Sequence, residues 1–121
     1  MRVAVPICRC RVSPVFDVAR RYRVIDVHSG RITDQADHVV CGEPCRELME
    51  LAVDQLICAG ITRELQIRLR SHGIDVMAGF CGAIDEVINA FLYGRLADGD
   101  FNMPGSEWRH HGLPMAQKTK G

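Results

Sequence analysis

The stretch Arg2-Val-Ala-Val-Pro-Ile-Cys-Arg-Cys-Arg11 starts as a short apolar run and ends in alternating cysteines and arginines. Residues 2–8 are predicted to form a β-strand, whose alternate side chains point to opposite faces of a sheet. If the chain stays extended for two more residues, Cys8 and Cys10 point the same way. In open α/β sheets, ligands commonly bind where strands end. The stretch therefore predicts a positively charged, thiol-bearing site at the end of the first strand.

The alternation in this first strand predicts that one face carries Val3, Val5 and Ile7. Residues 11–19 are predicted to be a loop, because Ser13-Pro14 is a turn signal. Residues 22–28 are rich in β-branched and aromatic residues and are predicted to form a second strand. Ser29-Gly30 is typical of a tight turn, and the polar residues 31–40 after it suit a strand at a sheet edge. The second and third strands are therefore expected to form an antiparallel hairpin.

The second half of the sequence alternates short strands with helices. Apolar residues recur at helical spacing in three segments, which predict one helix beginning at Pro44, one over residues 62–72 and one from Ile84 to Gly94. Residues 55–59 and 74–78 are short, mostly apolar runs, each followed by glycine. A short apolar run bounded by a turn signal predicts a buried strand. Strands separated by helices pair in parallel through right-handed crossovers. The predicted fold is therefore α/β, with a mixed five-stranded sheet, an N-terminal antiparallel hairpin and a parallel β-α-β second half.

The composition of the 121 residues suits one globular domain, with 47% hydrophobic and 25% charged residues. Fifteen basic residues balance fifteen acidic ones, so no overall charge attracts nucleic acid or an anionic membrane. Arg20, Arg21 and Arg23 form a small basic cluster, which by itself gives little support for nucleic-acid binding. No apolar run is long enough to span a bilayer or to serve as a secretory signal, which predicts a cytoplasmic protein.

One domain is predicted over residues 1–96. Residues 97–121 contain proline, glycine, lysine and two adjacent histidines without an apolar period, and they are predicted to form a flexible C-terminal tail. His110-His111 in this tail are candidate metal ligands, but they lack other ligands nearby in sequence, so a solvated role is favoured.

Six cysteines, at positions 8, 10, 41, 45, 58 and 81, are predicted to be reduced thiols. Their spacings, C-x-C and C-x3-C, lack the paired C-x2-C motifs of a zinc ribbon. Cys45 and Cys58 lie in apolar stretches and are predicted to be core residues. The sequence also lacks phosphate-loop, G-x-S-x-G, H-E-x-x-H and C-x-x-C motifs, so we expect that the protein is not an enzyme.

The strand ends near Cys8, Gly60 and Gly82 are predicted to meet at one rim. Glycine lets backbone N–H groups approach a ligand closely, and helix N-termini favour anions. Thiolates form more readily beside such termini or beside arginine side chains. A negatively charged metal–sulfur cluster would match all these features. The predicted metal ligands are Cys8 and Cys10 first, then Cys41 and Cys81, and the predicted cofactor-binding residues are Arg9, Arg11, Gly60 and Gly82.

Short motifs follow one another along residues 2–96: Val3-Ala-Val-Pro6, Val12-Ser-Pro-x-Phe-x-x-Ala19, Tyr22-x-Val-Ile-Asp26, Leu56-Ile-Cys-Ala-Gly-Ile61, Leu69-x-x-x-Gly-Ile-Asp-Val76 and Ile84-Asp-Glu-Val-Ile-Asn-Ala-Phe-Leu-Tyr-Gly-Arg-Leu96. In order and spacing this succession resembles the dinitrogenase iron–molybdenum cofactor biosynthesis family. The resemblance implies a ribonuclease-H-like, three-layer α/β domain without nuclease activity. It also implies a non-catalytic carrier or scaffold for iron–molybdenum cofactor or another metal–sulfur cluster, with cluster donor and acceptor proteins as partners.

Two departures from the family pattern favour thiol over imidazole ligands, and a third removes a thiol. Val15-Phe16-Asp17 stands where relatives commonly have His-Phe-Gly, so a candidate histidine ligand is missing. Val40-Cys-Gly-Glu-Pro-Cys45 replaces a segment that often bears histidine, and Ser106 stands where some relatives have cysteine. Thiolate-rich sites suit iron–sulfur clusters, copper or zinc. The expected cargo is an iron–sulfur or molybdenum–iron–sulfur cluster, with the metal left open.

The alternative is a metal-free regulatory or protein-interaction domain with mainly structural cysteines. It predicts thiols that react slowly with alkylating reagents, whereas a cluster site predicts fast alkylation of Cys8 and Cys10. A thiol-dependent enzyme ranks last, because no histidine lies near those cysteines in sequence. The sequence leaves open which proteins are partners and whether a homodimer completes the site.

Overall fold

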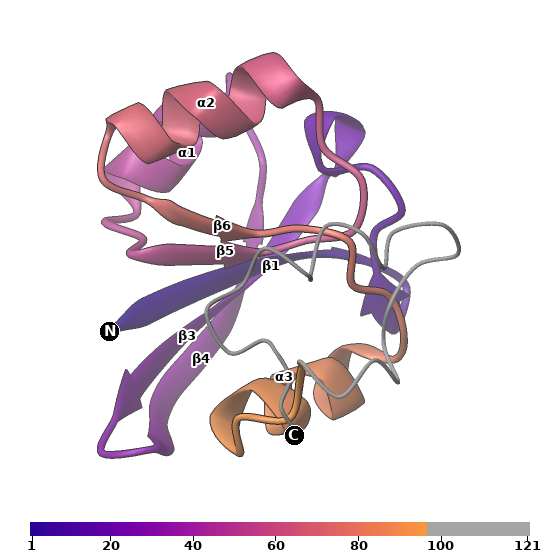
Figure 1. The fold of residues 1–121 in the computed structure, drawn as a ribbon, viewed down its shortest axis with the longest axis vertical. Helices are drawn as coiled ribbons and strands as arrows, with labels where there is room; N and C mark the ends of the chain where they lie inside the picture. Colours follow the sequence, from indigo (N-terminus) through magenta and orange to yellow (C-terminus); the bar gives the residue numbers. More distant parts are fainter. Residues whose placement is uncertain (97–121) are drawn as a thin grey trace, which may run out of the picture.

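A computed structural model describes residues 1–96 as a mixed α/β fold, in which helices cover both faces of a central sheet (Figure 1). The strands are β1 (Arg2–Cys8), β2 (Arg11–Val12), β3 (Arg21–His28), β4 (Arg31–Val39), β5 (Gln55–Ile57) and β6 (Asp75–Met77). The helices are α1 (Pro44–Glu50), α2 (Arg63–Ser71) and α3 (Ile84–Leu92), with a short 3-10 helix η1 (Phe16–Val18). The predicted flexible tail over residues 97–121, with His110-His111, lies outside the described residues.

The sheet has the order β4-β3-β1-β5-β6, and β2 pairs with β1 outside this path. β3 is antiparallel to both β1 and β4, which confirms the predicted hairpin and its edge strand. β5 is parallel to β1, and β6 is parallel to β5, as predicted for the second half. β1 therefore lies at the centre of the sheet, where the antiparallel hairpin meets the parallel strands.

The prediction of five strands is wrong, because the segment expected to be a loop begins with the short strand β2. Arg9 adopts a left-handed backbone conformation with φ of 61°, and the chain reverses so that Arg11 pairs with Cys8. Side chains at such φ values are uncommon, so nothing in the residue types marked this turn. Cys8 and Cys10 therefore do not lie on one extended strand.

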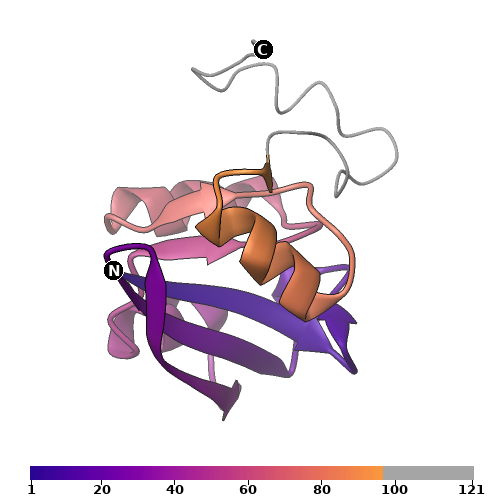
Figure 2. The same ribbon diagram turned by 90° about the horizontal axis from the view of Figure 1, so that it is seen from below.

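Two apolar cores lie on opposite faces of the sheet. On one face, α3 lies across the sheet (Figure 2). Its apolar residues share a core with Val3, Val5 and Ile7, the alternating β1 side chains predicted to lie on one face. On the other face, α1 and α2 enclose Phe16 and Tyr22, whose rings stack with centroids 5.5 Å apart. Cys45 and Cys58 are buried in this second core, which confirms their prediction as core residues.

The start of α1 follows from local capping, whereas Thr62 at the start of α2 makes no side-chain cap hydrogen bond. α1 begins at Pro44, as predicted, and the Glu43 carboxylate accepts hydrogen bonds from the N–H groups of Cys45 (3.0 Å) and Arg46 (3.1 Å). α2 begins after Thr62, also as predicted. No helix within residues 1–96 is both long enough and apolar enough to cross a membrane.

Candidate functional site

The carboxyl ends of β1, β5 and β6 lie at one edge of the sheet, because these strands are parallel. The segments that follow them carry most of the residues predicted for the cluster site. β4 is antiparallel to β3, which is antiparallel to β1, so β4 also ends at this edge. The edge is the place where ligands bind in open α/β sheets.

Backbone hydrogen bonds fasten the loop after β2 to the loop after β5. The Gly60 N–H donates to the Pro14 carbonyl (2.8 Å), and the Phe16 N–H donates to the Gly60 carbonyl (2.7 Å). A Cβ atom at position 60 would lie 2.8 Å from the Pro14 oxygen, so only glycine fits this approach. The Gly60 N–H, predicted as a donor to a bound anion, is thus used to join two loops.

The loop after β6 is fastened to β2 in the same way. The Val12 N–H donates to the Gly82 carbonyl, and the Ile84 N–H donates to the Cys10 carbonyl, both at 2.9 Å. These bonds bring the Cys81 segment beside the turn that holds Cys10. Two of the predicted thiol ligands therefore come from adjacent backbone segments that are far apart in sequence.

Asp17 replaces a glycine of the family pattern and has a structural contact here. Its carboxylate accepts hydrogen bonds from the Thr62 N–H (3.0 Å) and the Thr62 hydroxyl (2.7 Å). Thr62 precedes the first turn of α2, where a negative charge is favourable. Asp17 therefore holds the loop before β3 against the start of α2.

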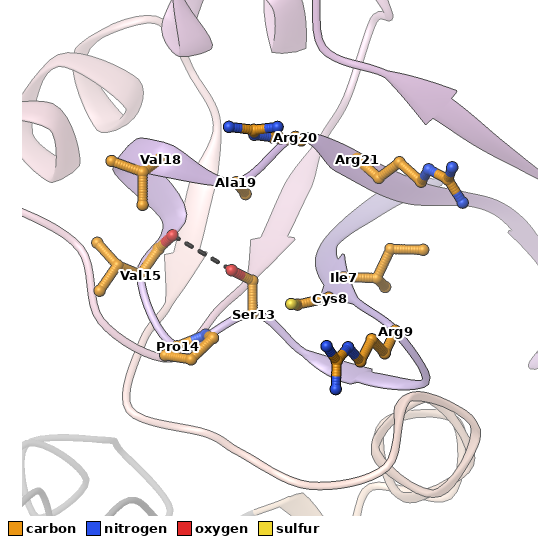
Figure 3. Close-up of a pocket in the computed structure, with 10 residues that line it drawn as sticks. All are labelled: Ile7, Cys8, Arg9, Ser13, Pro14, Val15, Val18, Ala19, Arg20 and Arg21. Carbon is orange, nitrogen blue, oxygen red and sulfur yellow. Dashed lines mark hydrogen bonds between the residues drawn. The ribbon is translucent and has the colours of Figure 1, made fainter.

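A cavity of about 590 Å³ opens beside the end of β1 (Figure 3). Its lining comes from β1, the turn after it, the loop that contains η1 and the start of β3: Ile7, Cys8, Arg9, Ser13, Pro14, Val15, Val18, Ala19, Arg20 and Arg21. The Cys8 sulfur points into the space between these residues, and Arg9 and Arg20 lie on opposite sides of it (Figure 3). The nearly buried Ser13 hydroxyl donates to the Val15 carbonyl (3.4 Å), which fixes one wall.

The cavity is strongly basic. Three arginines line it and no acidic side chain does. Within residues 1–96, no ion pair joins Arg9, Arg20 or Arg21 to a carboxylate. Arg2, Arg23, Arg46 and Arg68 each form an ion pair, and none of these four lines the cavity. The positive charge of the cavity is thus left uncompensated by the described part of the chain.

The predicted site residues separate into those at the cavity and those outside it. Cys8 and Arg9 line the cavity, and Cys10 is exposed in the adjoining turn. Cys81 is half-buried in the neighbouring loop. Cys41 is exposed and follows β4. β3 lies between β4 and β1, so β4 and β1 are roughly 10 Å apart, because neighbouring strands are about 4.8 Å apart.

No three histidine, cysteine, aspartate or glutamate side chains within residues 1–96 come close enough together to hold a metal ion. The four predicted thiols therefore do not form a preassembled metal centre. The sequence marks Arg20 and Arg21 only as a basic cluster and does not reveal that they line the cavity beside Cys8. The pairing of β3 with β1, in which Arg21 lies opposite Ile7, brings the start of β3 to the cavity.

One polar group near this end of the sheet is buried without a partner among residues 1–96. The Tyr22 hydroxyl has no hydrogen-bond partner among the described residues. Burial raises the pKa of Tyr22, and the nearby Glu47 and Glu43 carboxylates raise it further. The hydroxyl is therefore neutral and, in the described part of the chain, unsatisfied.

The fold and the cavity together define a small α/β domain with an arginine-rich, thiol-bearing cavity where its central strand ends. The sequence model of the dinitrogenase iron-molybdenum cofactor family matches residues 1–94. The chain belongs to this family, which confirms the resemblance seen in the motif succession.

Similar proteins support the same fold. An uncharacterised protein of Methanocaldococcus jannaschii, MJ0580, is 26% identical over 105 residues, which are 79% of this chain and 89% of that protein. The crystal structure of PH0822 matches with a TM-score of 0.75 at 26% identity and covers 78% of this chain and 91% of that one. A candidate dinitrogenase from Methanocaldococcus jannaschii, MJ0327, matches with a TM-score of 0.68 at 18% identity, covering 78% and 90% of the two chains. This last likeness concerns the fold alone.

Proposed function

We propose that this protein is a non-catalytic carrier or scaffold for an anionic metal–sulfur cluster, either iron–molybdenum cofactor or a related iron–sulfur cluster. The observation that carries the proposal is the cavity beside Cys8, which three arginines line without a compensating carboxylate. Membership of the dinitrogenase iron-molybdenum cofactor family supports this choice of cargo. The ribonuclease-H-like classification of the fold is part of the same proposal.

The cavity suits a preassembled cluster better than a bare metal ion. A bare ion needs three or four protein ligands, and within residues 1–96 no three histidine, cysteine or carboxylate side chains come together for this at the cavity. A cluster brings its own sulfides and a net negative charge, so it needs charge compensation and few protein ligands. Guanidinium groups form strong charge-assisted hydrogen bonds to anionic acceptors. One thiol and three guanidiniums therefore match a cluster delivered from elsewhere.

The proposal assigns different roles to the predicted residues. Cys8 is the first thiolate ligand, because its sulfur points into the cavity. Cys10 and Cys81 are secondary ligands from the adjoining segments. Cys41 is left out, since its strand lies two positions away from β1.

A carrier of this kind acts between two partners, a protein that donates the cluster and an enzyme that accepts it. An open cavity suits this task, since the cargo must enter and leave. We infer a cytoplasmic location, where exposed free thiols such as those of Cys8, Cys10 and Cys41 stay reduced. A second copy of the chain would supply further ligands if a homodimer forms around the cargo.

Anaerobic reconstitution with iron and sulfide, followed by absorption spectroscopy and metal analysis, tests the proposal. The wild type should take up cluster with charge-transfer absorption, and a Cys8→Ser/Cys10→Ser variant should lose most of it. Cys41→Ser removes an equally exposed thiol outside the cavity and should keep wild-type uptake. The proposal would be overturned if the wild type and the Cys8→Ser/Cys10→Ser variant took up the same negligible amount of metal.

The metal-free interaction domain has one supporting observation, the exposed apolar side chains of Val15 and Val18 at the cavity rim. Against it, three of the six cysteines are exposed and only Cys45 and Cys58 are buried. It predicts an unchanged melting temperature after chelation of protein purified without oxygen. The carrier predicts a fall in the melting temperature, because a ligand bound to the folded state stabilises it.

A further inference from the structure

A second group of soft donor atoms lies between α1 and the end of α2, and none of its residues lines the cavity. The Cys45 sulfur is 4.0 Å from the Met49 sulfur and 3.8 Å from Nδ1 of His72. Cys45 and Met49 are four residues apart in α1, so they share one face of that helix. His72 follows the last turn of α2. The Cys45 sulfur therefore lies within 4.0 Å of two different donor atoms, one from its own helix and one from the end of α2.

The separations match those of a three-coordinate metal ion. Metal–sulfur bonds of about 2.3 Å and metal–nitrogen bonds of about 2.0 Å are usual in proteins. With bond angles near 120°, such bonds hold the donor atoms about 3.7 to 4.0 Å apart. The two separations measured from Cys45 fall in this range, and the His72 ring has to turn from the Arg68 carbonyl to direct Nδ1 at the ion.

From this geometry we propose that Cys45, Met49 and His72 form a binding site for Cu(I). A thiolate, a thioether and an imidazole make a soft donor set, and thiolate and thioether ligands select Cu(I). A thioether contributes little to binding of harder ions such as Mg²⁺ or Ca²⁺, which prefer oxygen. The carbonyl groups at the end of α2 also favour a positive charge there.

The site is accessible from one side only. Cys45 is buried, whereas Met49 is about half exposed and His72 is exposed, so an ion can enter past the two outer ligands. Binding transfers the Cys45 thiol proton to solvent, because the thiolate is the ligand. Nδ1 of His72 lies 2.8 Å from the Arg68 carbonyl, so it carries the ring proton in the metal-free chain. Coordination through Nδ1 places that proton on Nε2 and breaks this hydrogen bond.

The test uses a background variant in which the other reactive ligands are removed. Cys8, Cys10, Cys41 and Cys81 become serine, and His110 and His111 become glutamine. Under anaerobic conditions this protein competes for Cu(I) with a chromophoric Cu(I) chelator. We expect it to withhold one equivalent of Cu(I), and we expect Met49→Leu and His72→Gln each to weaken Cu(I) binding at least tenfold.

A matched control and a second readout separate ligation from damage to the fold. Met77→Leu removes a half-buried sulfur of β6 and should leave Cu(I) affinity unchanged. Leucine conserves the volume of methionine, so thermal unfolding of both variants should stay near that of the background. The ¹³C-methyl resonance of Met49 should shift on addition of Cu(I) and stay in place with Mg²⁺. Equal Cu(I) affinity in the background and in Met49→Leu, or no uptake by the background, would overturn the proposal.

Discussion

The arginines at the two ends of β1 differ in whether a carboxylate balances their positive charge. At the start, the Arg2 guanidinium donates to the Asp26 carboxylate through Nε (2.8 Å) and Nη2 (3.3 Å), and to the Leu51 carbonyl through Nη1 (2.7 Å). At the end, Arg9, Arg20 and Arg21 surround the cavity without an ion pair in the described part of the chain.

The difference indicates which end serves the fold and which serves a ligand. A guanidinium that has a carboxylate partner and a carbonyl partner is already satisfied, so it adds to the stability of the folded chain. The three arginines that line the cavity have no ion pair within residues 1–96, so an anion bound in the cavity would offset their positive charge. Variants at each end should therefore change different measured quantities.

The largest effect is expected at the cavity end. Arg20→Gln combined with Arg21→Gln should weaken binding of an anionic iron–sulfur cluster by about a hundredfold, at roughly tenfold for each charge-assisted contact. The free energy of unfolding, measured by urea titration, should change by less than about 0.5 kcal/mol, since neither side chain has an ion pair to lose within residues 1–96. Arg31→Gln combined with Arg46→Gln removes the same charge outside the cavity and should leave affinity unchanged. Equal losses of affinity in both double variants would mean that net charge alone accounts for binding.

Gly60→Ala tests the wall of the cavity. The added methyl group meets the Pro14 carbonyl oxygen at 2.8 Å, and because this oxygen belongs to the backbone, the two loops must shift to relieve the contact. We expect a loss of about 2 kcal/mol in the free energy of unfolding, measured by urea titration. Gly42→Ala is the matched control, because its nearest neighbour is the flexible Glu47 carboxylate at 3.4 Å. Similar stability of the two variants would show that the loops can separate.

Tyr22→Phe should stabilise the protein. The substitution removes a buried hydroxyl that has no partner among residues 1–96 and keeps the ring stacked on Phe16. We expect a gain of about 1 kcal/mol, which corresponds to a rise in melting temperature of roughly 5 °C. Tyr93→Phe changes an exposed tyrosine and should leave the melting temperature unchanged. A lower melting temperature for Tyr22→Phe would mean that the hydroxyl has a partner in the folded chain.

The smallest effect is expected at the opposite end of β1 and depends on pH. The hydrogen bond from Arg2 holds the pKa of the Asp26 carboxyl below its usual range. The stability that this carboxylate adds is therefore present above its unfolded-state pKa of about 3.9 and is lost as pH falls through the folded-state pKa. Asp26→Asn should lower the urea midpoint at pH 7 and reduce its fall on acidification. Asp75→Asn, at an exposed position, should keep the wild-type acid dependence.

Local sequence signals predicted much of the fold. Ser29-Gly30 forms the turn of the hairpin, Pro44 begins α1, and alternation assigned the faces of β1. The strand β2 was missed because its existence depends on a left-handed arginine, which residue type does not reveal.

The candidate site was harder to predict, since it depends on pairing register and on loop packing. Arg21 reaches the cavity because β3 pairs with β1 so that Arg21 lies opposite Ile7. Gly60 was predicted as a donor to a ligand, but its N–H faces the Pro14 carbonyl of a loop distant in sequence. The meeting of the strand ends at one rim was predicted correctly from the parallel topology, whereas the turn at Arg9 and the partner of the Gly60 N–H were not.

The turn at Arg9 has a consequence for how substitutions at this position should be read. A left-handed backbone costs an arginine about 1 kcal/mol that a glycine would not lose. Arg9→Gly would relax the backbone and at the same time remove a guanidinium from the mouth of the cavity. Sequences selected only for thermal stability should drift toward glycine here, and sequences selected for holding an anion should keep the charge. The residue at position 9 therefore indicates whether a sequence was selected for stable folding or for binding an anion.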